Sequence, residues 1–238
     1  MIGRAMLVAI VSLGMPAVAG AQALQCMIPS APPQARPDLP TVKDPVRIVP
    51  VGGYTLALTW SPAYCRVHAR DSAAAFQCKT ANKFGFTLHG LWPDGVGKQW
   101  PQYCRATPVL PEAILRGMSC TTPSAQLVQH EWAKHGTCMG AMSASEYFAR
   151  SSGLFARLRY PDMNRLSHAP LSVGQFATLM ARENAGMRAD MIRVTADRRG
   201  WLDEVWLCLD KQYRFTRCAA HSGGLPPTAS LRIWRGGR

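Results

Sequence analysis

Eight cysteines constrain the fold of this 238-residue chain more than any other feature of its sequence. All of them lie after residue 25, their number is even, and no two of them form a C-x-x-C pair. In an exported chain, this predicts up to four disulfides and argues against a zinc ribbon or a redox motif. Eight cysteines allow on the order of a hundred pairings, so their spacing alone selects none.

The N-terminus predicts export. Arg4 precedes an apolar run over residues 5–18, and small residues follow that run. This is the pattern of a secretory signal peptide over residues 1–23, cleaved after Ala21 or Ala23. The run is too short to cross a membrane as a helix. We therefore expect a periplasmic or secreted protein with no stable membrane association.

The charge is the second unusual property. The formal net charge is +13, and loss of Arg4 with the signal peptide leaves +12 on the exported chain. Such a charge suggests a polyanionic partner, for which nucleic acid and an anionic membrane surface both qualify. An exported protein that is basic without such a partner is the third alternative. The length suits one sizeable domain.

The pattern along the chain predicts strands, then helices, then strands. Residues 24–52 are rich in proline and are expected to form an extended arm before a single domain over residues 53–238. The expected strands are 54–60, 84–89, 191–195, 201–208 and 212–218, and the expected helices are 112–118, 145–158, 172–184 and the segment between Ser124 and Gly136. This order predicts an α+β fold, with a central, mainly antiparallel sheet flanked by helices and stabilised by disulfides.

Three breaks are expected in this pattern. The strand over 84–89 is expected to end at Gly90 and Pro93. Residues 65–78 read as a polar loop, and residues 210–211 as the turn of a terminal hairpin. The basic tail, residues 232–238, is expected to be frayed.

Four ionisable side chains lie close together in the helix expected after the N-cap Ser124: His130, Glu131, Lys134 and His135. At about 100° per residue, an α-helix places all four on one arc. A solvated face would not need Trp132 beside it, and a core face would not carry these charges. The pattern therefore predicts a reaction surface that lines a cleft.

These residues suggest an acid–base chemistry. His135 and His89, which come from different elements, can act as a complementary pair near neutral pH. Lys134 and His130 can hold a phosphate or stabilise an oxyanion, and Glu131 can orient a partner. Since no serine or cysteine is placed as an activated nucleophile, the substrate must supply one, as the 2′-hydroxyl of RNA does.

A catalytic metal is not expected. The spacing of His130 and His135 is one residue longer than that of the metalloprotease motif, and in an α-helix it separates the two side chains by about 140°. Both histidines could then not face one zinc ion without a break in the helix. We predict that no metal and no cofactor is required.

Two segments carry a family resemblance. Residues 86–94, FTLHGLWPD, and residues 130–138, HEWAKHGTC, together resemble the ribonuclease T2 family at both of its catalytic segments. The resemblance extends over the domain from about Tyr54, and the signal peptide with a basic mature chain is similar to a bacterial periplasmic or secreted member.

The resemblance implies a monomeric, metal-independent endoribonuclease that cleaves single-stranded RNA with little base specificity. It implies that His89 is the general acid and His135 the general base of a transphosphorylation. It further implies that His130 binds the phosphate, and that Glu131 and Lys134 stabilise the transition state. The product would be a 2′,3′-cyclic phosphate, slowly hydrolysed to a 3′-phosphate. The alternative is a catalytically idle, secreted RNA-binding or interaction protein of the same fold.

Base binding and disulfides also follow from the resemblance. Trp92 and Asp94 match positions that hold a base, and Trp100 is a candidate stacking partner. His221 and two other histidines match no motif and are expected at the surface, whereas Trp206 is expected in the core. The implied disulfides are Cys104–Cys138, Cys65–Cys78 and Cys208–Cys218, with Cys26–Cys120 as the remaining pair.

Overall fold

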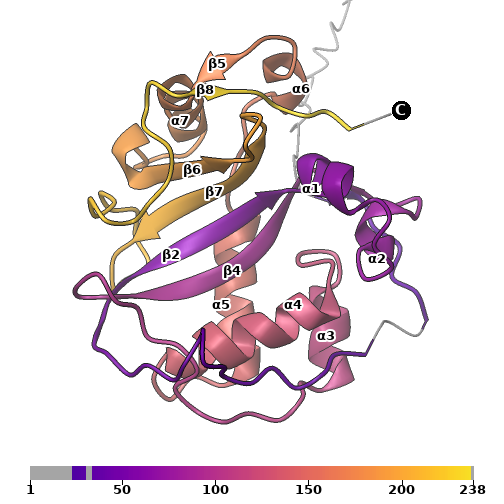
Figure 1. Cartoon of the computed structure of the whole chain (residues 1–238), viewed down its shortest axis with the longest axis vertical. Helices are drawn as coiled ribbons and strands as arrows, with labels where there is room; N and C mark the ends of the chain where they lie inside the picture. Colours follow the sequence, from indigo (N-terminus) through magenta and orange to yellow (C-terminus); the bar gives the residue numbers. More distant parts are fainter. Residues whose placement is uncertain (1–22, 31–33, 237–238) are drawn as a thin grey trace, which may run out of the picture.

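A four-stranded antiparallel sheet forms the centre of the computed structural model, which describes residues 23–30 and 34–236 (Figure 1). The strands lie in the order β4-β2-β7-β6 and have the bounds β2 Val51–Trp60, β4 Phe86–Gly95, β6 Ile192–Ala196 and β7 Leu202–Leu209. Apart from Ala23, the predicted signal peptide lies outside the described residues.

Short elements complete the fold. Two small antiparallel sheets pair β1 Ala23–Gln25 with β3 Lys83–Phe84, and β5 Leu171–Ser172 with β8 Ser230–Leu231. The helices are α1 Ser61–His68, α2 Ala75–Cys78, α3 Glu112–Met118, α4 Ala125–His130, α5 Ala144–Ala156, α6 Met163–Leu166 and α7 Val173–Arg182. A π-helix over Glu131–His135 and two 3-10 turns, Gly136–Cys138 and Ala189–Met191, complete the set. The α+β prediction is confirmed.

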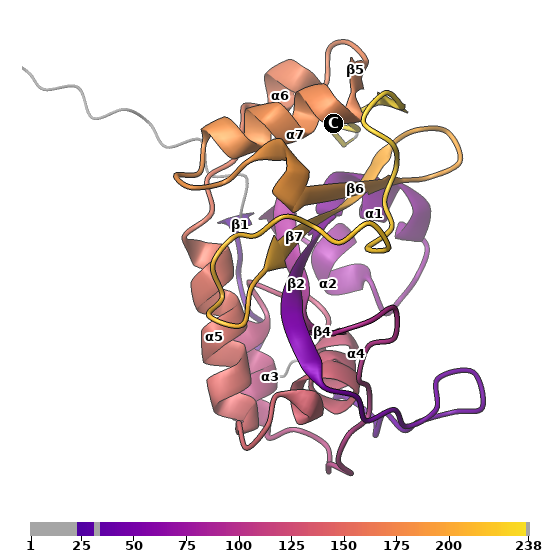
Figure 2. The ribbon, with the colours of Figure 1, turned by 90° about the vertical axis from the view of Figure 1, so that its left-hand side faces the viewer.

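The core lies between the sheet and α5. Figures 1 and 2 show α5 across one face of the sheet, with α1 and α2 on the other side. The central strand β2 is buried on both faces, as its consecutive residues Leu56, Ala57 and Leu58 are at most 1% exposed. From α5, the buried Tyr147 bonds through its hydroxyl to the backbone of Leu91, which fixes the helix to β4. The helix expected from residue 172 is present as α7, and Ser172 forms a capping box with Gln175 at its start.

The expected break in β4 is wrong, and a β-bulge takes its place. The strand continues through Gly90 and Pro93, which pair with β2 at Ala57 and Tyr54. Because Ala57 faces Gly90 and the next residue, Leu58, faces Leu88, His89 is an extra residue on β4. A bulge reverses the alternation of side chains from that point on. His89 and Trp92, which strict alternation would put on opposite faces, therefore lie side by side.

Three other expectations are also wrong. The loop expected over residues 65–78 is confined to residues 69–74, since residues 65–68 belong to α1 and residues 75–78 form α2. Pro62 favours α1 because it occupies the first turn, where its missing N–H costs nothing. Residues 212–218 form no strand and join the sheet only through the isolated Leu209–Phe215 bridge. The tail is not frayed up to residue 234, since Ile233 is 2% exposed and the carbonyl of Trp234 accepts a hydrogen bond from Trp60.

The disulfide predictions are confirmed. All eight cysteines are paired, as Cys26–Cys120, Cys65–Cys78, Cys104–Cys138 and Cys208–Cys218. The Cys26–Cys120 bridge fixes the start of the N-terminal arm, and Cys104–Cys138 joins a loop to the end of the π-helical segment. Among the described residues, no helix is long and apolar enough to span a membrane.

Candidate active site

The helix with the four ionisable residues changes its winding in the middle. It starts as predicted at Ser124, whose hydroxyl accepts a hydrogen bond of 3.2 Å from the N–H of Leu127. From Glu131 to His135 it is a π-helix, in which hydrogen bonds span five residues instead of four. Side chains five apart therefore come to nearly the same side. The α-helical wheel is wrong for this segment.

This winding also overturns the spacing argument against a metal. Donor atoms of His130, Glu131 and His135 all lie within 4.8 Å of one another. The rings of the two histidines are 6.2 Å apart and nearly perpendicular. Geometry therefore does not keep these three groups from a common ion.

Gly136 follows the π-helix and allows a close approach of the backbone to a ring. Its φ is −62°, so it does not adopt the left-handed conformation typical of a C-terminal glycine. A Cβ at this position would lie 2.3 Å from the ring of Trp132. The residue is glycine because the tight turn after His135 brings the backbone onto that ring.

His89 is held between two carboxylates. Its Nδ1 bonds to Oε1 of Glu204, and its Nε2 lies 3.5 Å from Oε1 of Glu131. The His89 side chain is 27% exposed, whereas those of Glu204 and Glu131 are 15% and 2% exposed. Burial by itself lowers the pKa of His89, but the hydrogen bond to Glu204 and the charges of Glu131 and Glu204 outweigh it and raise the pKa to about 9.

Glu131 reaches β4 because residue 90 is glycine. A Cβ on Gly90 would lie 1.7 Å from Oε2 of Glu131, so only glycine leaves room for the carboxylate there. The same oxygen accepts a hydrogen bond of 2.9 Å from the indole of Trp92. Burial raises the pKa of Glu131 to about 7, although the charge of His89 and this hydrogen bond oppose the rise.

His135 has the opposite electrostatic environment from His89. It is 7% exposed, and its Nδ1 is buried without a hydrogen-bond partner among the described residues. Burial, together with the positive charges of His130 and Lys134, lowers the pKa of His135 well below its usual range. Trp92 lies between the two histidines, with its ring 5.1 Å from that of His89 and 5.5 Å from that of His135.

The N-terminal arm contacts the other two ionisable residues. Asp38 accepts a hydrogen bond of 3.0 Å from the hydroxyl of Tyr103 and lies 2.9 Å from Nδ1 of His130. Asp44 pairs with Lys134 at 3.1 Å. Burial and the charge of Lys134 lower the pKa of His130, although Asp38 acts in the opposite direction. The predicted arm is thus a partner of the site and does not extend freely.

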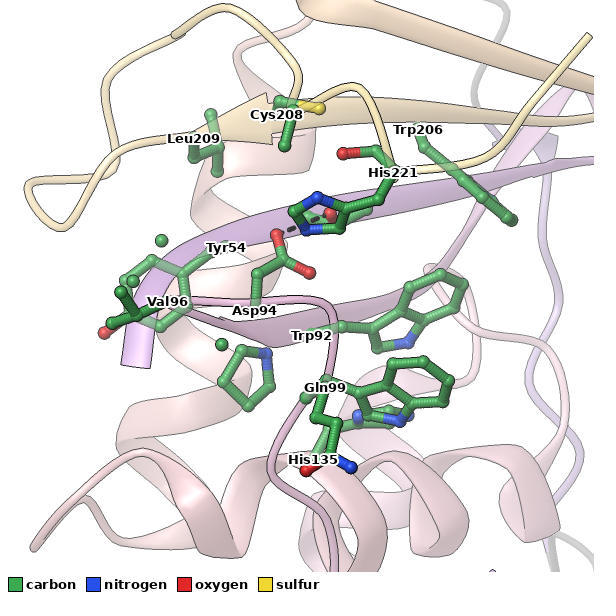
Figure 3. A pocket seen from close by; sticks show the side chains of 18 of the residues that line it. Tyr54, Trp92, Asp94, Val96, Gln99, His135, Trp206, Cys208, Leu209 and His221 are labelled. Atoms are coloured by element: carbon green, nitrogen blue, oxygen red, sulfur yellow. Dashed lines mark hydrogen bonds between the residues drawn. The ribbon is translucent and has the colours of Figure 1, made fainter. Parts of the chain in front are cut away.

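One pocket is lined by the five predicted catalytic residues and the three predicted base-binding residues. The cavity has a volume of about 900 Å³ and is lined by residues of β2, β4, the π-helix and β7. In Figure 3, Trp92 and Asp94 point into it from β4, and His221 lies next to Asp94 from the C-terminal segment. Asp94 accepts a hydrogen bond of 2.8 Å from Thr55, and burial raises its pKa. Trp100, which is 46% exposed, lines the same pocket.

All predicted catalytic and base-binding residues line this pocket, but sequence reasoning missed other residues that line it or contact its lining. Glu204 lies far from both motifs, in an ordinary strand pattern, and carried no signal. Trp206 was expected in the core, yet its ring packs edge-on against Trp92 at 5.6 Å and it lines the pocket. His221 is at the surface as expected, but the surface there is the pocket wall.

Comparisons with known proteins identify a family for this chain. Residues 51–218 match the sequence profile of the Ribonuclease T2 family. The chain is 33% identical over 165 residues to a ribonuclease of Aeromonas hydrophila, covering 67% of this chain and 72% of that protein. It is 29% identical over 180 residues to a probable ribonuclease of Haemophilus influenzae, covering 71% of this chain but only 61% of that protein.

The fold matches solved structures as well. A variant of RNase MC1 from bitter gourd seeds, in complex with 5′-UMP, superposes with a TM-score of 0.58 at 18% identity. The match covers 77% of this chain and 99% of that one. At this identity the likeness concerns the fold alone.

Proposed function

We propose, since the chain belongs to the ribonuclease T2 family, that it is an endoribonuclease that cleaves single-stranded RNA without a metal ion. The observation that carries this proposal is the contrast between His89 and His135, which line one pocket on either side of Trp92. The pKa of His89 is raised to about 9 and that of His135 is well below its usual range. At neutral pH one is therefore an acid and the other a base.

Cleavage is a transphosphorylation. Neutral His135 accepts the proton of the 2′-hydroxyl, whose oxygen attacks the adjacent phosphorus. The bond from phosphorus to the 5′-oxygen breaks, and protonated His89 gives its proton to that oxygen. The products are a 2′,3′-cyclic phosphate and a free 5′-hydroxyl. Hydrolysis to a 3′-phosphate follows slowly with the two histidines in exchanged roles.

The remaining ionisable groups serve the phosphate. Lys134 supplies a positive charge for the developing negative charge on the phosphoryl oxygens, and His130 binds the phosphate in the ground state. The pKa of Glu131 near 7 lets this residue act as a hydrogen-bond donor or acceptor to the same oxygens. Asp44 pairs with Lys134, and Asp38 bonds to His130. A bound phosphate therefore has to compete with these two carboxylates.

Low base specificity is part of the proposal. The pocket is open and carries aromatic surfaces at Trp92 and Trp100, on which any base can stack. Asp94 is a candidate for hydrogen bonds to a base edge.

The proposed place of the activity is outside the cytoplasm. The N-terminal sequence predicts export to the periplasm or the medium.

One set of oligonucleotides can test both that the 2′-hydroxyl is the nucleophile and that no metal ion is needed. In excess EDTA, the purified protein is expected to cleave an RNA oligonucleotide at the same rate as without it. The same sequence as DNA, or with 2′-O-methyl groups, should stay intact because it has no internal nucleophile. Strict dependence on a divalent ion, or cleavage of the DNA strand, would remove this mechanism.

A further inference from the structure

Glu204 contacts a histidine of the pocket, and neither motif contains it. Its Oε1 contacts Nδ1 of His89 and accepts a hydrogen bond of 3.3 Å from Thr59. Its Oε2 accepts one of 2.8 Å from the indole of Trp206. Oε1 is thus fixed by residues of β2 and β4 and Oε2 by a residue of β7 itself, and the side chain is only 15% exposed.

The register of the sheet explains why the carboxylate reaches His89. Glu204 on β7 faces Thr59 on β2, the strand that separates β7 from β4. Thr59 also faces Thr87 on β4, and His89 lies two residues beyond Thr87 on the same face, so the long Glu204 side chain crosses β2 to meet the imidazole.

The contact also settles which nitrogen of His89 can react. A carboxylate on Nδ1 keeps a proton there, so Nε2 is the nitrogen that exchanges a proton with a substrate. Other titratable groups around the ring are Glu131 and His135 on the π-helix, His130 before it, and Asp203 next to Glu204. Of the three carboxylates in this set, Glu204 alone bonds to Nδ1.

We propose that Glu204 is the positioning residue of His89, holding Nδ1 protonated and the ring oriented so that Nε2 delivers its proton to the leaving 5′-oxygen. This inference rests on the proposed ribonuclease function. Glu204 stays ionised throughout and takes no proton itself. The role differs from that of a structural carboxylate, because Thr59 and Trp206 could satisfy its oxygens without His89.

The pKa values of His89 and Glu204 are shifted in the directions that this role requires. His89 bound to Glu204 has its pKa raised to about 9, whereas Glu204 has its pKa lowered. Burial opposes both shifts, and the mutual hydrogen bond and charge overcome it. Removal of the carboxylate charge should therefore let His89 lose its proton at a lower pH.

The test is the pH profile of Glu204→Gln, which keeps the shape and an oxygen acceptor but removes the charge. We expect the alkaline limb of kcat, near pH 9 in the wild type, to move down by about one unit or more. At pH 8.5 the variant should lose at least about threefold in kcat, at pH 6 much less, and KM should change little. Asp203→Asn is the control, since Asp203 acts on His89 through its charge without bonding to it, and it should shift the limb less.

NMR titration of the His89 ring in both proteins separates this inference from the function. A lower His89 pKa in Glu204→Gln supports the contact whether or not RNA is cleaved. Lack of RNA cleavage by the wild type would refute the function and leave the titration result intact. An unchanged His89 pKa, or a loss of activity equal at every pH in a variant with wild-type Tm, would overturn the positioning role.

Discussion

His135→Ala is expected to cleave RNA about 10²–10⁴-fold more slowly than the wild type, which is the usual contribution of a general base. The reason is that the buried, neutral imidazole is the group poised to take the 2′-hydroxyl proton. Single-turnover cleavage of a short RNA oligonucleotide at pH 7 measures the loss. His168→Ala, which changes an exposed histidine away from the pocket, is the matched control and should retain wild-type turnover.

The loss has to be separated from misfolding. Because His135 is buried, its truncation leaves a small cavity and is expected to lower Tm. The comparison is therefore made at a temperature at which circular dichroism shows the variant folded. Wild-type-like turnover by folded His135→Ala would show that another group is the base.

The second large effect is expected for His89→Ala, and it depends on the leaving group. With ordinary RNA the loss should again be about 10²–10⁴-fold, because the alkoxide that leaves needs a proton. With a uridine 3′-phosphodiester whose leaving group is 4-nitrophenol, the variant should recover most of the activity, since nitrophenolate leaves without protonation. Release of nitrophenol followed by absorbance measures this.

The two variants together assign the roles. His135→Ala should stay slow with the nitrophenyl substrate, because the 2′-hydroxyl still has to lose its proton. If instead His135→Ala recovered with this substrate and His89→Ala did not, the acid and the base would be exchanged. If both variants lost activity to a similar extent on RNA and on the nitrophenyl substrate, neither residue would act as the acid.

Sequence patterns could predict the elements that carry the chemistry, because these depend on local signals. The N-cap Ser124 and the periodicity after it located the helix of His130 and His135, and the capped helix at Ser172 followed the same logic. The two motifs also predicted that His89 from a strand and His135 from a helix would line one pocket.

The irregular features could not be predicted, because each depends on contacts between segments that lie far apart in the sequence. The bulge at His89 exists in the pairing between β4 and β2, and the π-helix changes the helical phase that a wheel assumes to be constant. Glu204 contacts His89 across an intervening strand, at a separation of 115 residues, which no local pattern reports. Asp38 and Asp44 reach the site through the path of the arm, where composition indicated only extended chain.

Attack by the 2′-hydroxyl predicts a specific new end on the cleaved RNA. A DNA oligonucleotide with a single internal ribonucleotide, incubated with the protein in excess EDTA and analysed by mass spectrometry, measures it directly. The predicted result is one cut, 3′ to the ribonucleotide, with a 2′,3′-cyclic phosphate on one fragment and a 5′-hydroxyl on the other. A 5′-phosphate end, or cuts at the deoxyribonucleotides, would contradict attack by the 2′-hydroxyl and with it the roles given to His89 and His135.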